Sequence, residues 1–237
     1  SFIHNESLKV WRSAVFWVVA AVFTTLPLMI GLLKEPDVSW ETYYADILDS
    51  IASLLVVGFS FTSAWVFGRE YTDNTIKDLI VKPIPKSYSV LSKFIVITVW
   101  NTLIAIFTFA VITGAGTLIG VHGGSISTIL RIFGTFMTTA LFIMAVSSTS
   151  ALFANITKGY LAPIGLIFVI IIVSNPVVQL GLGPYFPWTI PVLLAKGSTD
   201  IGFVSTIILA LTAIAGFAGT LLGGDLQSIS KGQQTKK

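Results

Sequence analysis

The sequence has no cysteine, little charge and only two histidines among its 237 residues. Without cysteine, disulfides, thiolate catalysis and cysteine-ligated metal sites are excluded. Charged residues make up 11% of the chain, less than half of the roughly 25% of an ordinary soluble domain. Because 54% of the residues are hydrophobic, a soluble fold of this length could not bury its apolar side chains. This composition argues against a soluble enzyme and against a nucleic-acid-binding protein.

Motifs of catalysis and nucleotide binding are absent as well. The sequence contains no G-x-x-x-x-G-K-[ST] loop for nucleotide phosphates, and no H-E-x-x-H or G-x-S-x-G pattern. His4 and His122 both fall outside the apolar segments, and we interpret them as surface residues and not as metal ligands. We therefore expect no catalytic residue, no metal site and no bound cofactor in this chain.

Six long apolar segments alternate with short polar stretches. They cover residues 14–33, 45–67, 93–119, 130–153, 160–180 and 202–222. A membrane-spanning helix needs about 20 such residues, and the apolar runs are continuous and do not alternate with polar residues as barrel strands do. The sequence therefore predicts an all-α membrane protein with six transmembrane helices, in a single domain that covers residues 1–237.

Lysine and arginine are distributed unequally between the two sides of this topology. With the N-terminus inside, eleven of the fourteen cations fall in inner segments, and only Lys34, Arg131 and Lys196 fall in outer ones. By the positive-inside rule, both termini are predicted to be cytoplasmic. The chain shows no recognisable targeting sequence, so we expect a multi-pass protein in the plasma membrane of a prokaryote.

Polar residues dominate the two ends of the chain. Drawn as a helix, residues 1–13 have an apolar side that includes Leu8 and Trp11, and a polar side that includes Lys9. This pattern predicts a helix in the membrane interface, although the residues could also be only the basic start of the first span. Residues 224–237 are predicted to form a polar cytoplasmic tail.

The longest stretch between spans, residues 68–92, has the pattern of a short helix of its own. Thr75 begins a capping box, Ile76 and Leu79 form a small apolar face, and Pro83 would end the helix. Because this connection is longer than two neighbouring spans need, we expect it to contact another protein. The alternative is a solvated basic loop that only follows the positive-inside rule.

The same stretch resembles the cytoplasmic coupling segment of the ATP-binding cassette (ABC) type-2 exporter permeases. In that family the second span ends in a Glu-Tyr or Glu-Arg pair, then a Gly-Thr and a Leu-rich turn follow, and a Pro-x-Ser or Pro-Arg closes the segment. This chain departs from the pattern at Asn74, where glycine is usual, and at Lys86, where arginine is common. The residues that the resemblance assigns to coupling are Arg69, Glu70, Tyr71, Asp73, Thr75, Ile76, Lys77, Leu79, Pro83 and Lys86.

The resemblance implies a permease subunit that binds no ATP itself. Two copies of an ABC ATPase subunit, which would hold ATP and Mg, would dock on the coupling segments of two permease copies, expected to be a homodimer in the lipid bilayer. The cargo would be hydrophobic or amphiphilic: a peptide antibiotic, a lipid-linked molecule or a drug, exported by alternating access. Small bacteriocin- and bacitracin-resistance exporters of this family are similar in length and in the coupling stretch.

Two further regions agree with the resemblance. Residues 1–13 match the family's elbow helix, and residues 181–200 look like its outer re-entrant element, whose irregular backbone a bilayer permits only where protein or water covers it. The residues concerned are Pro184, Tyr185, Phe186, Pro187, Trp188 and Pro191. The alternative for residues 181–200 is an aromatic belt at the interface with proline turns.

Polar residues inside the spans are few. The candidates for lining a cargo pathway are Asn101, Ser147, Ser148, Asn155 and Asn175. Alternatively, such groups join helices by hydrogen bonds worth about 1 kcal/mol each. Arg131, near the outer end of the fourth span, could either reach lipid headgroups or face a phosphate-bearing cargo.

Two other functions are compatible with parts of the sequence. A non-transporting scaffold or sensory protein could bind a cytoplasmic partner through residues 68–92, but it would have little need of the proline-rich residues 181–200. An ion-coupled carrier is disfavoured, because such carriers keep ionisable residues inside their spans and this chain has almost none there.

Overall fold

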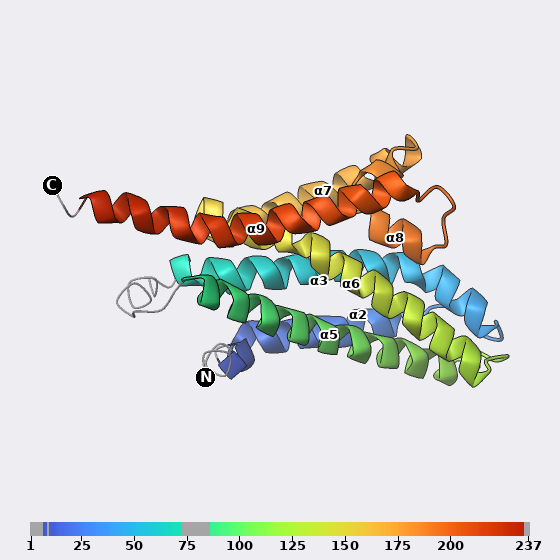
Figure 1. The fold of residues 1–237 in the computed structure, drawn as a ribbon. Coiled ribbons are helices and arrows are strands. Elements are labelled where there is room, and N and C mark those ends of the chain that lie inside the picture. The colour runs from blue at the N-terminus through green and yellow to red at the C-terminus, as the bar shows by residue number, and fades with distance from the viewer. Residues whose placement is uncertain (1–6, 9, 73–85, 235–237) are drawn as a thin grey trace.

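The computed structural model describes residues 7, 8, 10–72 and 86–234, with side chains up to residue 223 apart from that of Lys86. The described chain is almost wholly helical (Figure 1). Six of its helices are long and apolar enough to cross a membrane, which confirms the predicted all-α fold. They are α2 (Ala14–Leu32), α3 (Trp40–Thr72), α5 (Lys86–Leu118), α6 (Ile126–Thr157), α7 (Leu161–Gln179) and α9 (Phe203–Gln234). The 3-10 helix η1 (Gly183–Tyr185) and the short α8 (Ile190–Ala195) lie between α7 and α9.

Helix α3 is the centre of the bundle. Helices α2 and α5 pack together on one side of it, α7 and α9 lie on the other, and α6 crosses diagonally to contact both α3 and α9 (Figure 1). In the most apolar stretch of α3, 78% of the residues are buried, compared with 17% for α7 and 22% for α2. Helices α2 and α7 therefore keep most of their apolar surface free for lipid or another subunit.

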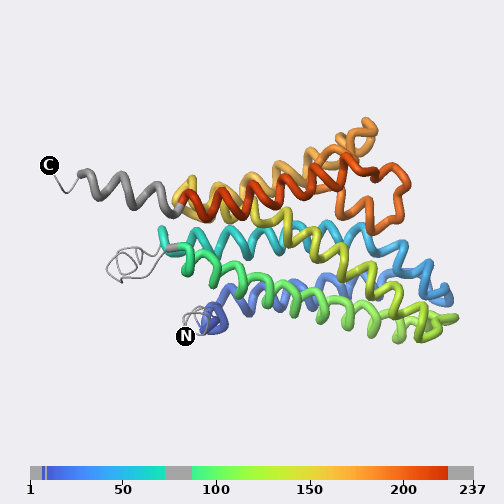
Figure 2. The backbone as a smooth tube through the Cα atoms, viewed as in Figure 1, coloured from blue at the N-terminus to red at the C-terminus, as the bar shows by residue number. Residues whose placement is uncertain are grey.

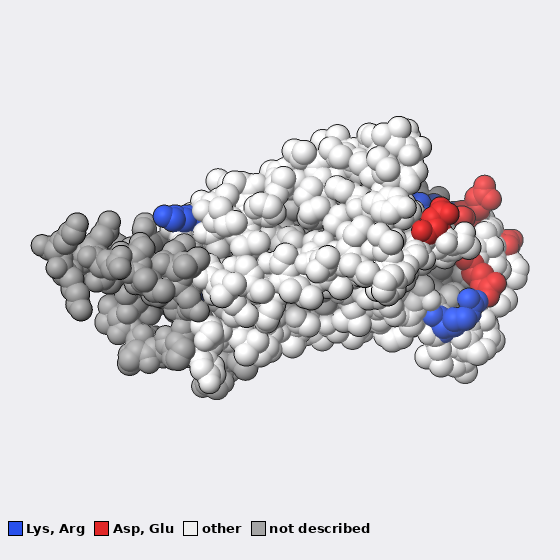
Figure 3. Space-filling view, turned by 45° about the horizontal axis from the view of Figure 1, so that its top comes forward, with Lys and Arg blue, Asp and Glu red and all other residues white. Residues whose placement is uncertain are grey.

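The six long helices run side by side, so their connections gather at two ends (Figure 2). We call the end that holds the start of α2, the end of α3 and the α6–α7 turn the terminal end. The opposite end, which holds residues 33–39, 119–125 and 180–202, is called the loop end. On the face seen in Figure 3, acidic and basic side chains gather at the loop end and an uncharged band separates them from the terminal end. An uncharged band of this kind suits the hydrocarbon core of a bilayer.

Serine side chains begin three of the long helices. Ser13 Oγ accepts a hydrogen bond from the Val15 amide at 3.0 Å, and Ser39 and Ser125 accept one in the same way at the starts of α3 and α6. These bonds satisfy amides that have no partner inside the helix. Helix α6 ends at Thr157 and is capped by Lys158, whose φ of 52° is left-handed, and α7 begins three residues after Lys158. The chain therefore reverses in a tight α6–α7 turn.

Helices α3 and α5 extend beyond the predicted spans 45–67 and 93–119. Helical structure continues past the apolar residues to Thr72 in α3, and α5 begins at Lys86. Charged residues can remain helical at the end of a span when they are paired or reach water, so hydropathy underestimates the helix length. The predicted coupling segment 68–92 thus begins inside α3 and ends inside α5.

Two predicted end segments are described in part. Of the predicted interfacial helix 1–13, residues 7, 8, 10 and 11 are described and helical, and Trp11 is 58% exposed. Helix α9 extends to Gln234, so it includes most of the predicted tail 224–237. The position of either segment relative to a membrane stays a prediction.

Candidate functional site

A buried ion pair joins the end of α3 to the beginning of α5. Lys93 Nζ donates a hydrogen bond to Glu70 Oε2, and the two side chains are only 6% and 10% exposed. Charges removed from water are tolerated when they are paired in this way. The pair therefore fixes the relative position of the two helices that flank residues 73–85.

Aromatic rings surround these charges. The guanidinium carbon of Arg69 lies 4.5 Å from the centre of the Trp65 ring, and Lys93 Nζ lies 5.1 Å from the centre of the Phe67 ring. A cation held over an aromatic face regains part of the stabilisation that it loses on leaving water. We call Arg69, Glu70 and Lys93 the charged cluster.

The α6–α7 turn lies against the same end of α3. A Cβ atom added to Gly68 would lie 2.5 Å from the backbone nitrogen of Tyr160 and 2.7 Å from the carbonyl carbon of Gly159, so no larger residue fits. One turn further along α3, the Tyr71 hydroxyl donates to Asn155 Oδ1 at 3.3 Å. The charged cluster is therefore connected both to α5 and to the turn between α6 and α7.

The structure places only part of the predicted coupling residues. Arg69, Glu70 and Tyr71 lie together at the end of α3, and Lys86 is the first residue of α5. The other six, Asp73, Thr75, Ile76, Lys77, Leu79 and Pro83, lie outside the described residues. Sequence analysis missed Lys93, which it counted only as a positive charge of the inner side. Glu70 lies at the end of the second predicted span and Lys93 at the start of the third, on the same side of the membrane. Two opposite charges at such facing positions could have indicated the pair.

Polar residues also meet in the middle of the bundle, between α3, α5 and α6. Thr62 donates to Asn101 Oδ1 at 2.9 Å, and the hydroxyls of Ser60 and Ser147 lie 3.2 Å apart. Asn101 is fully buried, and its Nδ2 has no hydrogen-bond partner among the described residues. Both contacts run between helices, which is the geometry of interhelical hydrogen bonding.

The other predicted pathway residues lie elsewhere. The Ser148 hydroxyl is 3.2 Å from the Ala213 carbonyl oxygen, where α6 touches α9. Asn155 belongs to the terminal end through its contact with Tyr71, whereas Asn175 is exposed near the loop end. In a single copy of the chain, Asn101 and Ser147 therefore lie in the middle of the bundle, whereas Asn155 and Asn175 lie near opposite ends.

The predicted outer element folds into η1 and α8 at the loop end (Figure 1). The Thr189 hydroxyl holds its turns together, lying 2.6 Å from the Gly183 carbonyl oxygen and 2.9 Å from that of Phe186. Pro191 is buried, and α8 packs against α3 and α6. The other predicted residues of this element are partly buried, except for the exposed Tyr185; they are Pro184, Phe186, Pro187 and Trp188.

A small cleft opens beside this element, between α3, α7 and α8. Its volume is about 160 Å³, and its walls are partly polar, with Ser53, Asn175 and Trp188 among the lining residues. At its edge Lys196 Nζ lies 3.0 Å from Asp49 Oδ1. Among the described residues, no group of three histidine or acidic side chains is arranged to hold a metal ion.

Replacing Thr189 with valine is expected to loosen the outer element. Valine keeps the shape of the side chain but loses both contacts to backbone carbonyls, at a cost of about 1 kcal/mol. Hydrogen exchange should then become faster at the amides of residues 183–195. Thr206→Val is the matched control, because the Thr206 hydroxyl is exposed and donates to the carbonyl oxygen of Gly202, the residue just before its own helix. Equal exchange in the two variants would show that Thr189 does not hold the element.

Taken together, the six apolar helices define a multi-pass membrane protein with a charged cluster where one connection joins two core helices. Residues 2–174 match the family of ABC-2 family transporter proteins. Over 198 residues the chain is 23% identical to the bacitracin transport permease protein BCRB of Bacillus licheniformis, an alignment that covers 80% of this chain and 94% of that protein. The chain therefore belongs to the ABC-2 transporter family. Membership in this family of membrane permeases implies an ATP-binding partner subunit, and it confirms the resemblance noted in the sequence.

Proposed function

We propose that this chain is the permease subunit of an ABC exporter that moves a hydrophobic or amphiphilic cargo by alternating access. Two copies of a separate ATPase subunit would bind ATP and Mg, and two permease copies about a two-fold axis would enclose the path. The bacitracin transport permease among the relatives supports a peptide antibiotic as the cargo. A path for hydrophobic or amphiphilic cargo would also suit lipid-linked molecules and drugs.

The observation that carries the proposal is the ion pair between Glu70 and Lys93. An ATPase subunit that moves residues 73–85 would pull on the end of α3 and on the start of α5. Because the ion pair joins these two helices, they would move as one body. The close contact between Gly68 and the α6–α7 turn would pass the movement on to the far side of the bundle.

The distribution of charge supports a cytoplasmic terminal end. The loop end carries six acidic residues and three cations, and each cation is engaged there: Arg131 with Glu41, Lys196 with Asp49, and Lys34 with the Asp46 carbonyl oxygen. In the topology predicted from the sequence, the remaining eleven cations of the chain fall in inner segments. This bias is the positive-inside pattern, with the loop end outside. On the outer side, η1 and α8 would form the re-entrant element.

A transport assay in proteoliposomes tests the proposed function. Vesicles that contain the permease and its ATPase subunit are expected to move bacitracin when ATP is added. Glu70→Ala should leave ATP hydrolysis in place, because it does not change the apolar face of the predicted coupling helix that would bind the partner. It should lower transport about tenfold, within the usual range of a coupling free energy. Glu41→Ala is the control, because Glu41 is an exposed acid at the loop end.

Two results would count against the proposal. Transport by Glu70→Ala at the rate of Glu41→Ala would remove the charged cluster from the coupling mechanism. An absence of ATP-dependent movement for any amphiphilic cargo would favour a scaffold that only binds a cytoplasmic partner.

A further inference from the structure

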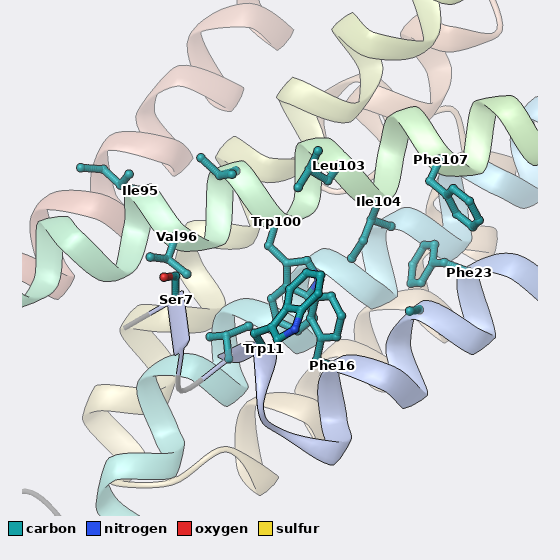
Figure 4. Close-up of a pocket in the computed structure, with 13 residues that line it drawn as sticks. Ser7, Trp11, Phe16, Phe23, Ile95, Val96, Trp100, Leu103, Ile104 and Phe107 are labelled. Carbon is teal, nitrogen blue, oxygen red and sulfur yellow. The ribbon is translucent and has the colours of Figure 1, made fainter. Parts of the chain in front are cut away.

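An apolar groove runs along the bundle between the N-terminal residues, α2 and α5 (Figure 4). Its volume is about 450 Å³, which falls in the range of small-molecule binding sites. Ser7 supplies a hydroxyl at the terminal end of the groove, and the other lining residues are apolar or aromatic. The polar group is thus confined to one end of an otherwise apolar surface.

The length of the groove matches one leaflet of a bilayer. Its α5 wall extends from Ile95 to Phe107, a rise of about 18 Å at 1.5 Å per residue. Half of a hydrocarbon core about 30 Å thick is about 15 Å. An extended hydrocarbon chain that entered at the terminal end would therefore lie in the groove over the depth of one leaflet.

Aromatic rings form the surface of the groove near its polar end. Phe16 stacks on Trp100 with ring centres 5.3 Å apart, and the Trp11 ring lies 4.8 Å from Phe16 (Figure 4). Trp11 is exposed, as is the adjacent Arg12. Tryptophan favours the headgroup depth of a membrane, and arginine there attracts lipid phosphate. The groove thus has apolar walls, and the exposed Arg12 follows the lining residue Trp11 at its terminal end, which we call the mouth.

The groove is a poor binding site for water. Most of its walls lie on two of the membrane-spanning helices, and the walls offer water almost no polar partner. An empty groove would lose the dispersion contacts of its lining. A molecule with a flexible apolar chain and one anionic end would contact the apolar walls through its chain and would be attracted to Arg12 through its anionic end.

We propose that the groove binds one acyl chain of an anionic phospholipid from the leaflet at the terminal end. The chain lies along α5 and the phosphate lies beside Arg12. The concave, aromatic walls hold this lipid longer than the lipids that cover the convex faces of α7. The proposal concerns a bound lipid and does not depend on transport or on the identity of the cargo.

Native mass spectrometry of the detergent-purified full chain, exchanged into phosphatidylglycerol, tests this site. The wild type is expected to retain a single phosphatidylglycerol. Ala20→Phe fills the groove from α2 and should lose that lipid, and Val99→Trp fills it independently from α5. Ala21→Phe is the matched control, because Ala21 is exposed and does not line the groove. A thermal melt of each variant shows whether it remains folded.

Two further variants test the charged mouth. Arg12→Gln should lower the preference for phosphatidylglycerol over phosphatidylcholine about fivefold, the effect expected of one cation near the membrane surface. Lys158→Gln, an exposed cation in the α6–α7 turn, should leave that preference unchanged. Equal losses of preference in the two variants would contradict the assignment of Arg12.

Two outcomes would overturn the proposal as a whole. The first is equal lipid retention by folded Ala20→Phe, Ala21→Phe and wild type, which would place the lipid elsewhere. The second is efficient disulfide formation between two copies of a Leu103→Cys variant without any retained phospholipid. Leu103 lines the groove and is 58% exposed, so this result would show that a second copy of the chain covers it.

Discussion

Replacing Lys93 with methionine is expected to destabilise the protein by about 3–5 kcal/mol, because the buried Glu70 carboxylate would lose its partner. The second carboxylate oxygen, Oε1, has no hydrogen-bond partner among the described residues. Among the described residues, Lys93 is therefore the hydrogen-bond donor to the Glu70 carboxylate. Denaturant unfolding in detergent micelles, followed by tryptophan fluorescence, measures the loss.

A double variant separates the loss of a partner from the loss of the pair. Glu70→Gln combined with Lys93→Met removes both charges of the pair, so most of the stability lost in Lys93→Met should return. Lys196→Met is the matched control, because it breaks an ion pair whose side chains are 45% and 52% exposed. Exposed pairs contribute about 0–1 kcal/mol. Equal destabilisation by Lys93→Met and Lys196→Met would show that burial of the first pair has no energetic consequence.

The same double variant distinguishes unfolding from uncoupling in the transport assay. It is expected to remain folded and still to transport more slowly than the wild type, because methionine cannot donate a hydrogen bond to glutamine. Wild-type transport by this variant would mean that packing alone holds α3 and α5 together at the terminal end.

Substitution of Gly68 by valine is expected to force α3 away from the α6–α7 turn. The nearest atoms belong to the backbone of Gly159 and Tyr160, which cannot rotate aside as a flexible side chain would. Overpacking of this kind costs about 1–3 kcal/mol and shifts the backbone. Since the charged cluster begins at the next residue, we expect ATP-driven transport to fall together with stability.

Gly165 of α7 provides the control for this substitution. A Cβ atom added there would meet nothing within 4 Å, so Gly165→Val should leave both stability and transport close to those of the wild type. Stability is measured by thermal unfolding and transport by ATP-dependent uptake into inverted vesicles. If the two valine variants behave alike, the contact between α3 and the turn is not part of the coupling path.

The number and order of the helices could be predicted from the sequence because apolar runs of membrane length are an unambiguous signal. The residues at which the helices end could not be predicted in this way. Hydropathy stops at the first charged residues, whereas α3 continues through Arg69 and Glu70 to Thr72. Those charges remain helical because the ion pair with Lys93 and the Trp65 ring surround them, and these partners are brought close only by the packing of the helices.

Sequence patterns could not predict the contacts between residues that are distant in the chain. The family pattern pointed to Glu70, but Lys93 lies 23 positions away and looked like one more cation of the inner side. Arg131 suggested a lipid headgroup or a phosphate as its partner. The structure instead pairs it with Glu41, 90 positions away, because α3 and α6 lie side by side at the loop end.

The central claim is that this permease is coupled to a separate ATPase subunit through the connection between α3 and α5. The most direct test reconstitutes the chain with candidate ATP-binding subunits in nanodiscs and measures ATP hydrolysis, with and without alanine at Ile76 and Leu79. We predict activity that requires both proteins and falls in the alanine variants, because these two residues form the apolar face of the predicted coupling helix. Failure of the chain to associate with any ATP-binding subunit, or full activity in the alanine variants, would contradict the account.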